Sequence, residues 1–248
     1  MTGGITIGVV GKYTDLPDAY MSIIEAVHHA GVSNGVYAHV RLIDGETLNE
    51  QNLQEALGDL DGILVPGGFG ARAFEGKILA CKYARVNKIP FLGICLGLQA
   101  AVCEISRNVC ELEGATSTEF DENAQHQVIH IMPDQENIDD KGGTMRLGAY
   151  PCEIVAGTLA QKLYGAKSVM ERHRHRYEVN NQYREILQLG GVTFCGLSPN
   201  GKLVEMIELA DHPYFIASQA HPEFKSRPTR PHPLFDGLVA AAKSKHSQ

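Results

Sequence analysis

The sequence contains no run of about 18 apolar residues, the length that a helix needs to cross a bilayer. Its first residues, MTGGITIGVVGKY, lack the basic region and the long apolar core of a secretory signal peptide. Basic residues are not in excess, because 22 Lys and Arg face 29 Asp and Glu and the formal net charge is −7. The acidic balance disfavours nucleic acid as the main partner. We therefore expect a cytoplasmic protein with no membrane span and no nucleic-acid partner.

The six cysteines form no C-x-x-C pair and are spread too widely for a disulfide scaffold or a zinc knuckle. We expect free thiols in a reducing compartment and no metal site. The sequence also lacks internal repeats and low-complexity linkers. A chain of 248 residues can bury one substantial core, so residues 1–248 are predicted to form a single domain.

Apolar segments alternate with amphipathic segments in the first half of the chain. Strands are predicted at 5–10, 36–43, 61–65 and 88–94, and helices at 18–30, 49–60, 75–87 and 97–109. Continuous apolar strands with short connections predict an α/β fold, with a mostly parallel central sheet flanked by helices on both faces.

The second half of the chain is less regular. A loop is expected at 134–143, strand-like segments at 146–155 and 191–220, a hairpin turn at 211–213, and a closing helix from Leu234. The segment 171–178, ERHRHRYE, is dense in charge. On its own it is interpreted as a solvated face or, less favoured, as a weak metal cluster.

A cysteine stands between two glycines where a predicted strand meets a predicted helix, in Gly93-Ile94-Cys95-Leu96-Gly97. The pattern G-x-C-x-G is the cysteine form of the nucleophile elbow, a sharp strand-to-helix turn that exposes its central residue. The helix beginning at Leu96 directs its positive end at Cys95, which favours the thiolate, and the Leu96 N–H can donate to an oxyanion. A tight turn with an incidental cysteine is the alternative interpretation.

A cysteine nucleophile needs a base, and the best candidate is His221 in the segment SQAHPEF. On an extended segment, residues i and i+2 point to the same side, so Glu223 can hold the imidazole in its useful tautomer. An earlier strand ends in LVPGGFG, where Gly68 can present a second oxyanion N–H because no side chain intervenes. A plain turn is the alternative for this glycine segment.

These segments resemble the class I, or triad, glutamine amidotransferases. The resemblance runs over essentially the whole chain and is narrower than the class, because several segments are similar to the glutaminase domain of the CTP synthase family. PGGFG, GICLG and HPE are typical of the class, whereas GKYTDLPDAY, GGTMRLG and ERHRHRYEVN are typical of that family. The other similar segments are MSIIEA, ILV, ARAFEGKI, PFL, LQ, RNV, STEFD and FKSRP.

The resemblance implies that Cys95 attacks the side-chain amide carbon of L-glutamine and forms a thioester. His221, oriented by Glu223, would protonate the leaving ammonia and then activate water to hydrolyse the thioester. Glu119 would bind the α-amino group as a carboxylate meeting an ammonium. Without the resemblance, Glu119 would be interpreted as a surface acid. The implied oxyanion donors are Gly68 and Leu96, and the implied substrate-binding residues are Gly68, Leu96, Gly97, Leu98, Gln99, Glu119, Arg176 and Tyr177.

In that family the ammonia passes to an N-terminal ATP-dependent synthase domain, which aminates UTP to CTP, and GTP activates the glutaminase allosterically. The chain has no phosphate-binding G-x-x-x-x-G-K-[ST] segment, so the synthase domain is not expected in it. The resemblance implies no cofactor for this domain, but ATP, Mg²⁺ and GTP for the full-length enzyme, a homo-oligomer that is expected to be a tetramer. It also implies a part for Arg72 and Arg146 in lid movement or the response to GTP.

Two other functions remain open from the sequence. One is a free-standing Cys-His-Glu hydrolase of the γ-glutamyl hydrolase type, against which the long CTP-synthase-like segments argue. The other is a non-catalytic regulatory relative, against which the intact Cys95, His221 and Glu223 argue. The start MTGG is typical of a start placed on a linker, which favours an excised domain over a free-standing protein.

Overall fold

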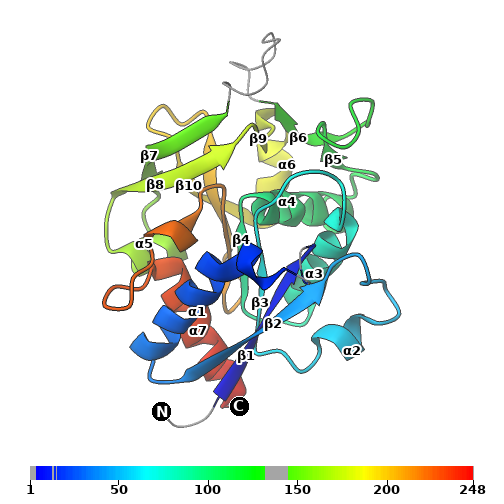
Figure 1. Cartoon of the computed structure of the whole chain (residues 1–248). Coiled ribbons are helices and arrows are strands. Elements are labelled where there is room, and N and C mark those ends of the chain that lie inside the picture. The colour runs from blue at the N-terminus through cyan, green and yellow to red at the C-terminus, as the bar shows by residue number, and fades with distance from the viewer. Residues whose placement is uncertain (1–3, 13, 15, 132–144, 248) are drawn as a thin grey trace.

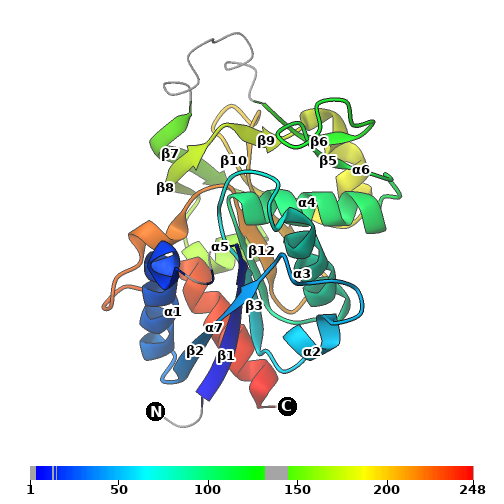
Figure 2. The same cartoon turned by 45° about the vertical axis from the view of Figure 1, so that its right-hand side comes forward.

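A nine-stranded sheet runs through the computed structural model, which describes residues 4–12, 14, 16–131 and 145–247. Figures 1 and 2 show α1 and α7 on one side of this sheet and α3 and α4 on the other. The strands of the sheet are β1 Gly4–Gly11, β2 Tyr37–Asp44, β3 Gly62–Val65, β4 Phe91–Ile94, β7 Arg146–Ile154, β8 Ser168–His175, β10 Val192–Leu197, β11 Val204–Leu209 and β12 Phe215–Ser218.

The remaining elements cover the sheet or lie toward its upper end in the view of Figure 1. A three-stranded sheet consists of β5 Thr116–Ser117, β6 Gln127–Ile131 and β9 Tyr177–Val179. The α-helices are α1 Met21–Ser33, α2 Leu53–Leu57, α3 Phe74–Val86, α4 Leu96–Asn108, α5 Leu159–Tyr164, α6 Arg184–Leu189 and α7 Pro233–His246. The short 3₁₀ helices are η1 Pro17–Tyr20, η3 Asn181–Tyr183 and η4 Pro222–Lys225.

The strand order is β2-β1-β3-β4-β12-β11-β10-β7-β8. The five strands from β2 to β12 are parallel neighbours, whereas the pairs from β12 to β8 are antiparallel. The predicted α/β fold with a flanked central sheet is confirmed, and the parallel half is the half that carries the elbow. The second half of the chain supplies the antiparallel strands, and the predicted hairpin turn joins β11 to β12.

Strand residues alternate between two apolar cores, one on each face of the sheet. Leu92 and Ile216 lie in a cluster with residues of α1 and α7. Their neighbours Phe91 and Phe215 lie in a cluster with residues of α3 and α4, and their rings stack with centroids 4.3 Å apart. Because both faces are covered, the central strands are apolar at successive positions, which is why the sequence shows continuous apolar runs.

Several predicted boundaries differ from the observed ones. The helix expected at 18–30 begins as η1 and continues through Gly31 to Ser33. The helix expected at 49–60 is only Leu53–Leu57, because Asn49 and Asn52 accept hydrogen bonds from nearby backbone N–H groups, an alternative to helical bonding.

The structure does not test two further expectations, one about a loop and one about the number of domains. The expected loop at 134–143 lies outside the described residues, and the single-domain prediction stays a prediction. Within the residues that the structure describes, no helix is both long and apolar enough to cross a membrane.

Candidate active site

Cys95 lies at the corner where β4 gives way to α4. Its backbone has φ 52° and ψ −103°, a positive φ that is rarely adopted by residues other than glycine and is found at strained functional turns. A Cβ on Gly93 would stand 2.8 Å from Gly97 O, and a Cβ on Gly97 would stand 2.0 Å from Val65 O. Both glycines are therefore needed for the close approach of strand, corner and helix, as the elbow pattern predicts.

His221 reaches the elbow because β12 is the parallel neighbour of β4. The two strands pair in register, with Ile94 opposite Ser218, so the residues that follow each strand emerge side by side. The His221 backbone N–H donates to Arg172 O at 2.7 Å, which ties this segment to β8. A Cβ on Gly67 would lie 2.9 Å from His221 Cε1 and 3.4 Å from Cys95 Cβ, so both side chains gather at one loop.

The imidazole of His221 is held by Glu223, as the H-x-E spacing predicts. Its Nδ1 lies 2.7 Å from Glu223 Oε1, and since a carboxylate accepts, the proton on that side belongs to Nδ1. Nε2 is buried and pairs with no nitrogen or oxygen of the described residues, so the Cys95 sulfur is the group that it faces. Burial alone would lower the pKa of His221, but hydrogen bonds and charge from Cys95 and Glu223 raise it to about 10. The arrangement favours an imidazolium beside the sulfur.

The two predicted oxyanion donors lie beside each other. Among the described residues, the N–H groups of Gly68 and Leu96 donate to no backbone carbonyl, whereas Leu98 N–H donates to Cys95 O at 3.0 Å. A Cβ on Gly68 would stand 3.6 Å from Leu96 Cδ2, so the glycine loop lies against the first turn of α4, which also contains Gly97. The roles of these groups stay predictions.

A buried glutamine and a strand carbonyl contact the sulfur, and a second buried glutamine contacts the first. Gln219 Nε2 lies 3.7 Å from Cys95 Sγ, and Sγ lies 3.8 Å from Arg174 O on β8. Gln99 Nε2 donates to Tyr177 O at 3.1 Å and to Gln219 Oε1 at 3.4 Å. Gln219 was not predicted from the sequence, although a polar residue directly after an apolar strand and two positions before His221 was a usable signal.

The residues expected at the amino-acid end of the substrate lie near one another. Glu119 Oε1 accepts from Gly70 N–H at 2.8 Å, which joins the STEFD segment to the glycine loop. Burial raises the pKa of Glu119, while the Gly70 hydrogen bond and the charges of Lys12 and Arg176 oppose the shift. The pKa of Tyr177 is raised by burial and by the charge of Glu119. Glu119, Arg176 and Tyr177 are thus electrostatic neighbours, and the Tyr177 carbonyl accepts from Gln99; their part in substrate binding stays a prediction.

The charge-dense segment at 171–178 is not simply a solvated face, so that interpretation is wrong for half of its residues. In β8, Glu171, His173 and His175 are buried while the two arginines between them are exposed. His173 Nδ1 lies 3.0 Å from His175 Nε2. Burial and the charge of Arg146 lower the pKa values of His173 to about 2 and His175 to about 3. The pair is therefore neutral, and the described residues contain no group of three His, Cys, Asp or Glu that could hold a metal.

The two arginines with an implied part in lid movement occupy different environments. Arg146 is buried and makes a two-pronged ion pair with Glu205, with N–O distances of 2.7 and 3.0 Å. Arg72 is exposed; it lies 2.9 Å from Glu46 and donates to Lys12 O at 2.7 Å. A nucleotide could reach Arg72 directly but could reach Arg146 only if the ion pair opened, and both assignments stay predictions.

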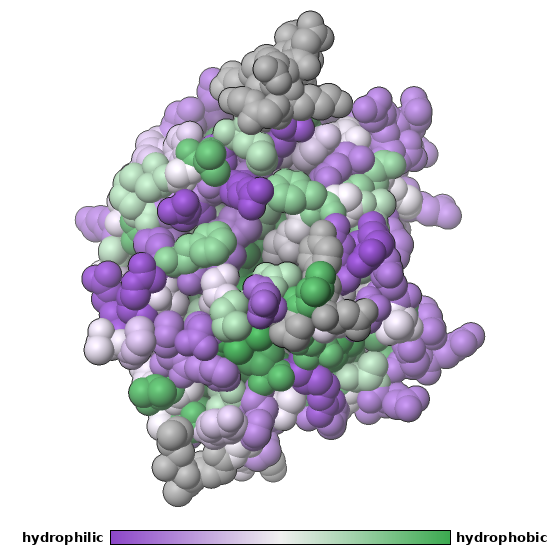
Figure 3. Space-filling view, in the orientation of Figure 1, coloured by the Kyte–Doolittle hydropathy of each residue, from purple (hydrophilic) through white to green (hydrophobic). Residues whose placement is uncertain are grey.

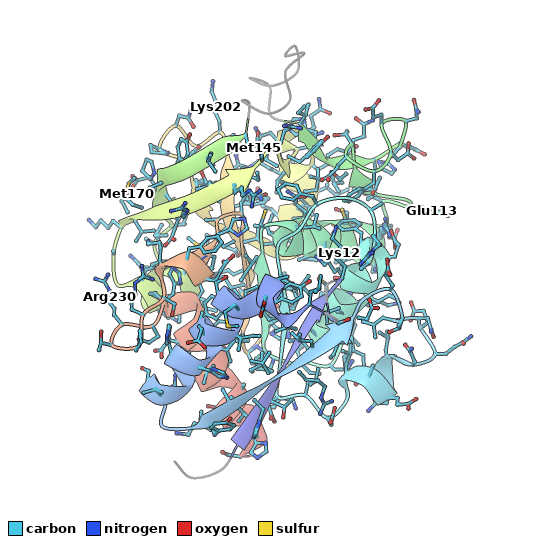
Figure 4. The ribbon with its side chains drawn as sticks, viewed as in Figure 1. Lys12, Glu113, Met145, Met170, Lys202 and Arg230 are labelled. Atoms are coloured by element: carbon cyan, nitrogen blue, oxygen red, sulfur yellow. The ribbon has the colours of Figure 1, made fainter. Side chains whose placement is uncertain are left out.

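Lys12, labelled in Figure 4, follows β1, and its ammonium donates to the carbonyl of Phe69. The Arg174 guanidinium lies 5.6 Å from the centre of the Phe69 ring. On the face shown in Figure 3, strongly hydrophobic residues gather near the middle of the molecule, and the upper part is a mixture of hydrophobic and hydrophilic residues. The six cysteines are all free thiols, as predicted.

The family model for glutamine amidotransferase class-I matches residues 15–241 of the chain. The CTP synthase of Methanocaldococcus jannaschii is 60% identical in an alignment 244 residues long that covers 96% of this chain and 45% of that protein. The CTP synthase of Bacillus subtilis is 55% identical over 238 residues, which are 96% of this chain and 44% of that protein. The chain thus spans about half the length of the curated relatives that it matches.

The chain is also similar to solved structures. A Trypanosoma brucei CTPS glutaminase domain with bound acivicin has a TM-score of 0.91 and 38% identity, over 97% of this chain and 94% of that chain. A glutamine amidotransferase from Thermotoga maritima has a TM-score of 0.54 at 13% identity over 97% of both chains, a likeness that shows the fold alone.

Proposed function

The chain belongs to the class I glutamine amidotransferase family, and from this premise we propose that it hydrolyses the side-chain amide of L-glutamine to glutamate and ammonia. The observation that carries the proposal is the Cys95 elbow with His221 beside it and Glu223 at 2.7 Å from the imidazole. The extensive similarity to the CTPS glutaminase domain of T. brucei supports the same substrate.

In the proposed reaction the Cys95 thiolate attacks the amide carbon, and the carbonyl oxygen gains negative charge. The N–H groups of Gly68 and Leu96 face that charge and stabilise it. The His221 imidazolium gives its proton to the leaving nitrogen, and ammonia departs as the thioester forms. Neutral His221 then takes a proton from water, which attacks the thioester and releases glutamate. Glu223 keeps Nδ1 protonated through both steps, so Nε2 alone exchanges protons.

Glu119 is the proposed anchor for the α-ammonium group of glutamine. A half-buried carboxylate that accepts one backbone hydrogen bond still has capacity to accept from an ammonium. Arg176 and Tyr177 lie on the same side and would contact the remaining groups of the amino-acid end.

We expect Glu119→Gln to raise KM for glutamine about 10- to 100-fold with a smaller change in kcat, because the lost charge contacts a part of the substrate that does not react. Steady-state ammonia release at varied glutamine concentration measures both constants. Glu122→Gln, an exposed acid three residues along, is the matched control. An unchanged KM in Glu119→Gln would remove this residue from the binding site.

Beyond this chain, the proposed use of the ammonia is the ATP-dependent amination of UTP to CTP by a synthase domain, and the name CTP synthase of its relatives supports the product. The chain would then supply ammonia within an amide ligase of pyrimidine biosynthesis. The synthase domain of that enzyme would bind ATP and Mg²⁺. GTP activation and assembly into a tetramer belong to the same proposal. The exposed guanidinium of Arg72 fits a phosphate group in charge and access.

The chain alone is expected to hydrolyse glutamine slowly, because activation by a synthase domain and GTP is missing. The test compares its kcat with that of full-length B. subtilis CTP synthase, with L-glutamine and γ-glutamyl peptides as competing substrates. Activity equal to that of the assembled enzyme would refute dependence on the synthase domain. A preference for the peptides would instead favour a γ-glutamyl hydrolase.

A further inference from the structure

A lysine side chain lies buried beside the loop that carries the predicted oxyanion donor. Lys77, in the first turn of α3, is 1% exposed. Its Nζ donates to Pro66 O at 3.1 Å, a neutral acceptor. Removing an ammonium from water costs several kcal/mol, and the positive end of α3 adds to that cost. A residue that destabilises the fold in this way needs another reason to be there.

The loop 66–68 separates Lys77 from the proposed reacting groups. A Cβ on Gly68 would stand 3.5 Å from Lys77 Nζ, whereas a Cβ on Gly67 would stand 2.9 Å from His221 Cε1 and 3.4 Å from Cys95 Cβ. One side of the loop therefore contacts the lysine, and the other side contacts the proposed nucleophile and its base.

On the basis of the proposed glutaminase activity, we propose that Lys77 is a positioning residue that fixes the oxyanion loop through Pro66 O and supplies positive charge behind it. The carbonyl and N–H of one trans peptide point in opposite directions. With Pro66 O turned toward Lys77, the N–H of Gly67 points toward the side that faces Cys95. Holding this peptide also restricts rotation of the next peptide, which carries the N–H of Gly68.

The positive charge of Lys77 and its hydrogen bond to Pro66 O both favour the proposed reaction. Burial lowers the pKa of Lys77 to about 8, and the charge of Cys95 opposes that lowering. Because electrostatic coupling is reciprocal, the ammonium favours the Cys95 thiolate and any oxyanion formed next to it. The other charged or titratable neighbours are Lys12, which lowers the pKa of Lys77 further, and Cys81, which opposes the lowering.

We expect Lys77→Met to lower kcat for glutamine about 10- to 100-fold with KM changed less than about threefold, because charge and loop position act on the transition state. The melting temperature should stay level or rise, since an apolar side chain replaces a buried charge. Lys82→Met, on the more exposed side of the same helix, is the matched control and should leave both constants unchanged. A fall in kcat that merely follows a fall in melting temperature would assign Lys77 a structural role and overturn the proposal.

A second readout does not depend on glutamine turnover. Alkylation of Cys95 by iodoacetamide at pH 7, followed by mass spectrometry, should be about tenfold slower in Lys77→Met than in the wild type, because the thiolate loses a nearby positive charge. An unchanged alkylation rate together with unchanged kcat overturns the role of Lys77. If the wild-type chain alkylates at Cys95 but never releases ammonia from glutamine, the proposed function fails, and slower alkylation of Lys77→Met would still show the charge effect.

If Lys77→Met does not fold, the pH dependence of kcat in the wild-type chain tests the proposal. Because the ammonium is lost as the pH rises through about 8, kcat should fall over that range. A kcat that stays level up to pH 9 would overturn the proposal.

Discussion

Replacing Cys95 by alanine is expected to reduce glutamine hydrolysis at least ~1000-fold, because no other group at the elbow can form the thioester. The fold should tolerate the change, since alanine removes one buried sulfur and can adopt the positive φ of Cys95 at a similar conformational cost. Ammonia release measures activity, and the melting temperature confirms that the variant is folded.

The other thiols provide the control for this experiment. Cys110 is a half-buried thiol whose sulfur contacts Ile186 O rather than the triad, so Cys110→Ala should keep wild-type activity. In wild-type protein a glutamine-like electrophile should label Cys95 alone. Turnover by Cys95→Ala within tenfold of the wild type would show that the elbow cysteine is not the nucleophile.

Local sequence patterns predicted the centre of the site because their spacing is itself the geometry. G-x-C-x-G specifies a corner with room for close backbone contacts, and the structure shows these contacts at Gly93 and Gly97. H-x-E specifies two side chains on one side of an extended segment, and His221 and Glu223 meet at 2.7 Å. Family resemblance then supplied Glu119 and Arg176, which no spacing rule could have joined to a triad.

The parts that escaped prediction depend on contacts between distant segments. β8 lies at the far edge of the strand order, yet its carbonyls reach His221 N–H and the Cys95 sulfur. The many charges of 171–178 concealed a strand with alternating buried and exposed side chains. Lys77 gave no signal of burial, because a lysine in a helix is normally solvated and the loop 66–68 that lies against it is placed there only by folding. The burial of a polar side chain therefore cannot be predicted from residue type alone when its partners come from distant segments of the chain.

Replacing Glu223 by glutamine is expected to lower kcat about 100- to 10,000-fold while leaving the Cys95 corner intact. A glutamine amide can donate to Nδ1, which would keep the proton of the neutral imidazole on Nε2 and leave no lone pair there to take a proton from water. In the variant, the imidazole would also lose the carboxylate charge that, in the wild type, helps to raise the pKa of His221 to about 10. Glu223→Asp keeps the charge on a shorter side chain and should recover part of the activity. A kcat for Glu223→Gln within threefold of the wild type would contradict the role of this carboxylate.

The same variant makes a prediction about stability and pH. The pKa of His221 in the folded protein, about 10, lies above its ordinary value of about 6.5, so protonation favours the folded state. This contribution is fully present below pH 6.5 and is lost as the pH rises toward 10. In Glu223→Gln the folded-state pKa falls, so the variant should lose most stability relative to wild type below about pH 6.5 and progressively less above it. Urea unfolding of both proteins between pH 5.5 and 9.5 measures the difference. A gap that widens with increasing pH would mean that Glu223 does not hold a protonated imidazole, and the proposed proton transfer to ammonia would lose its source.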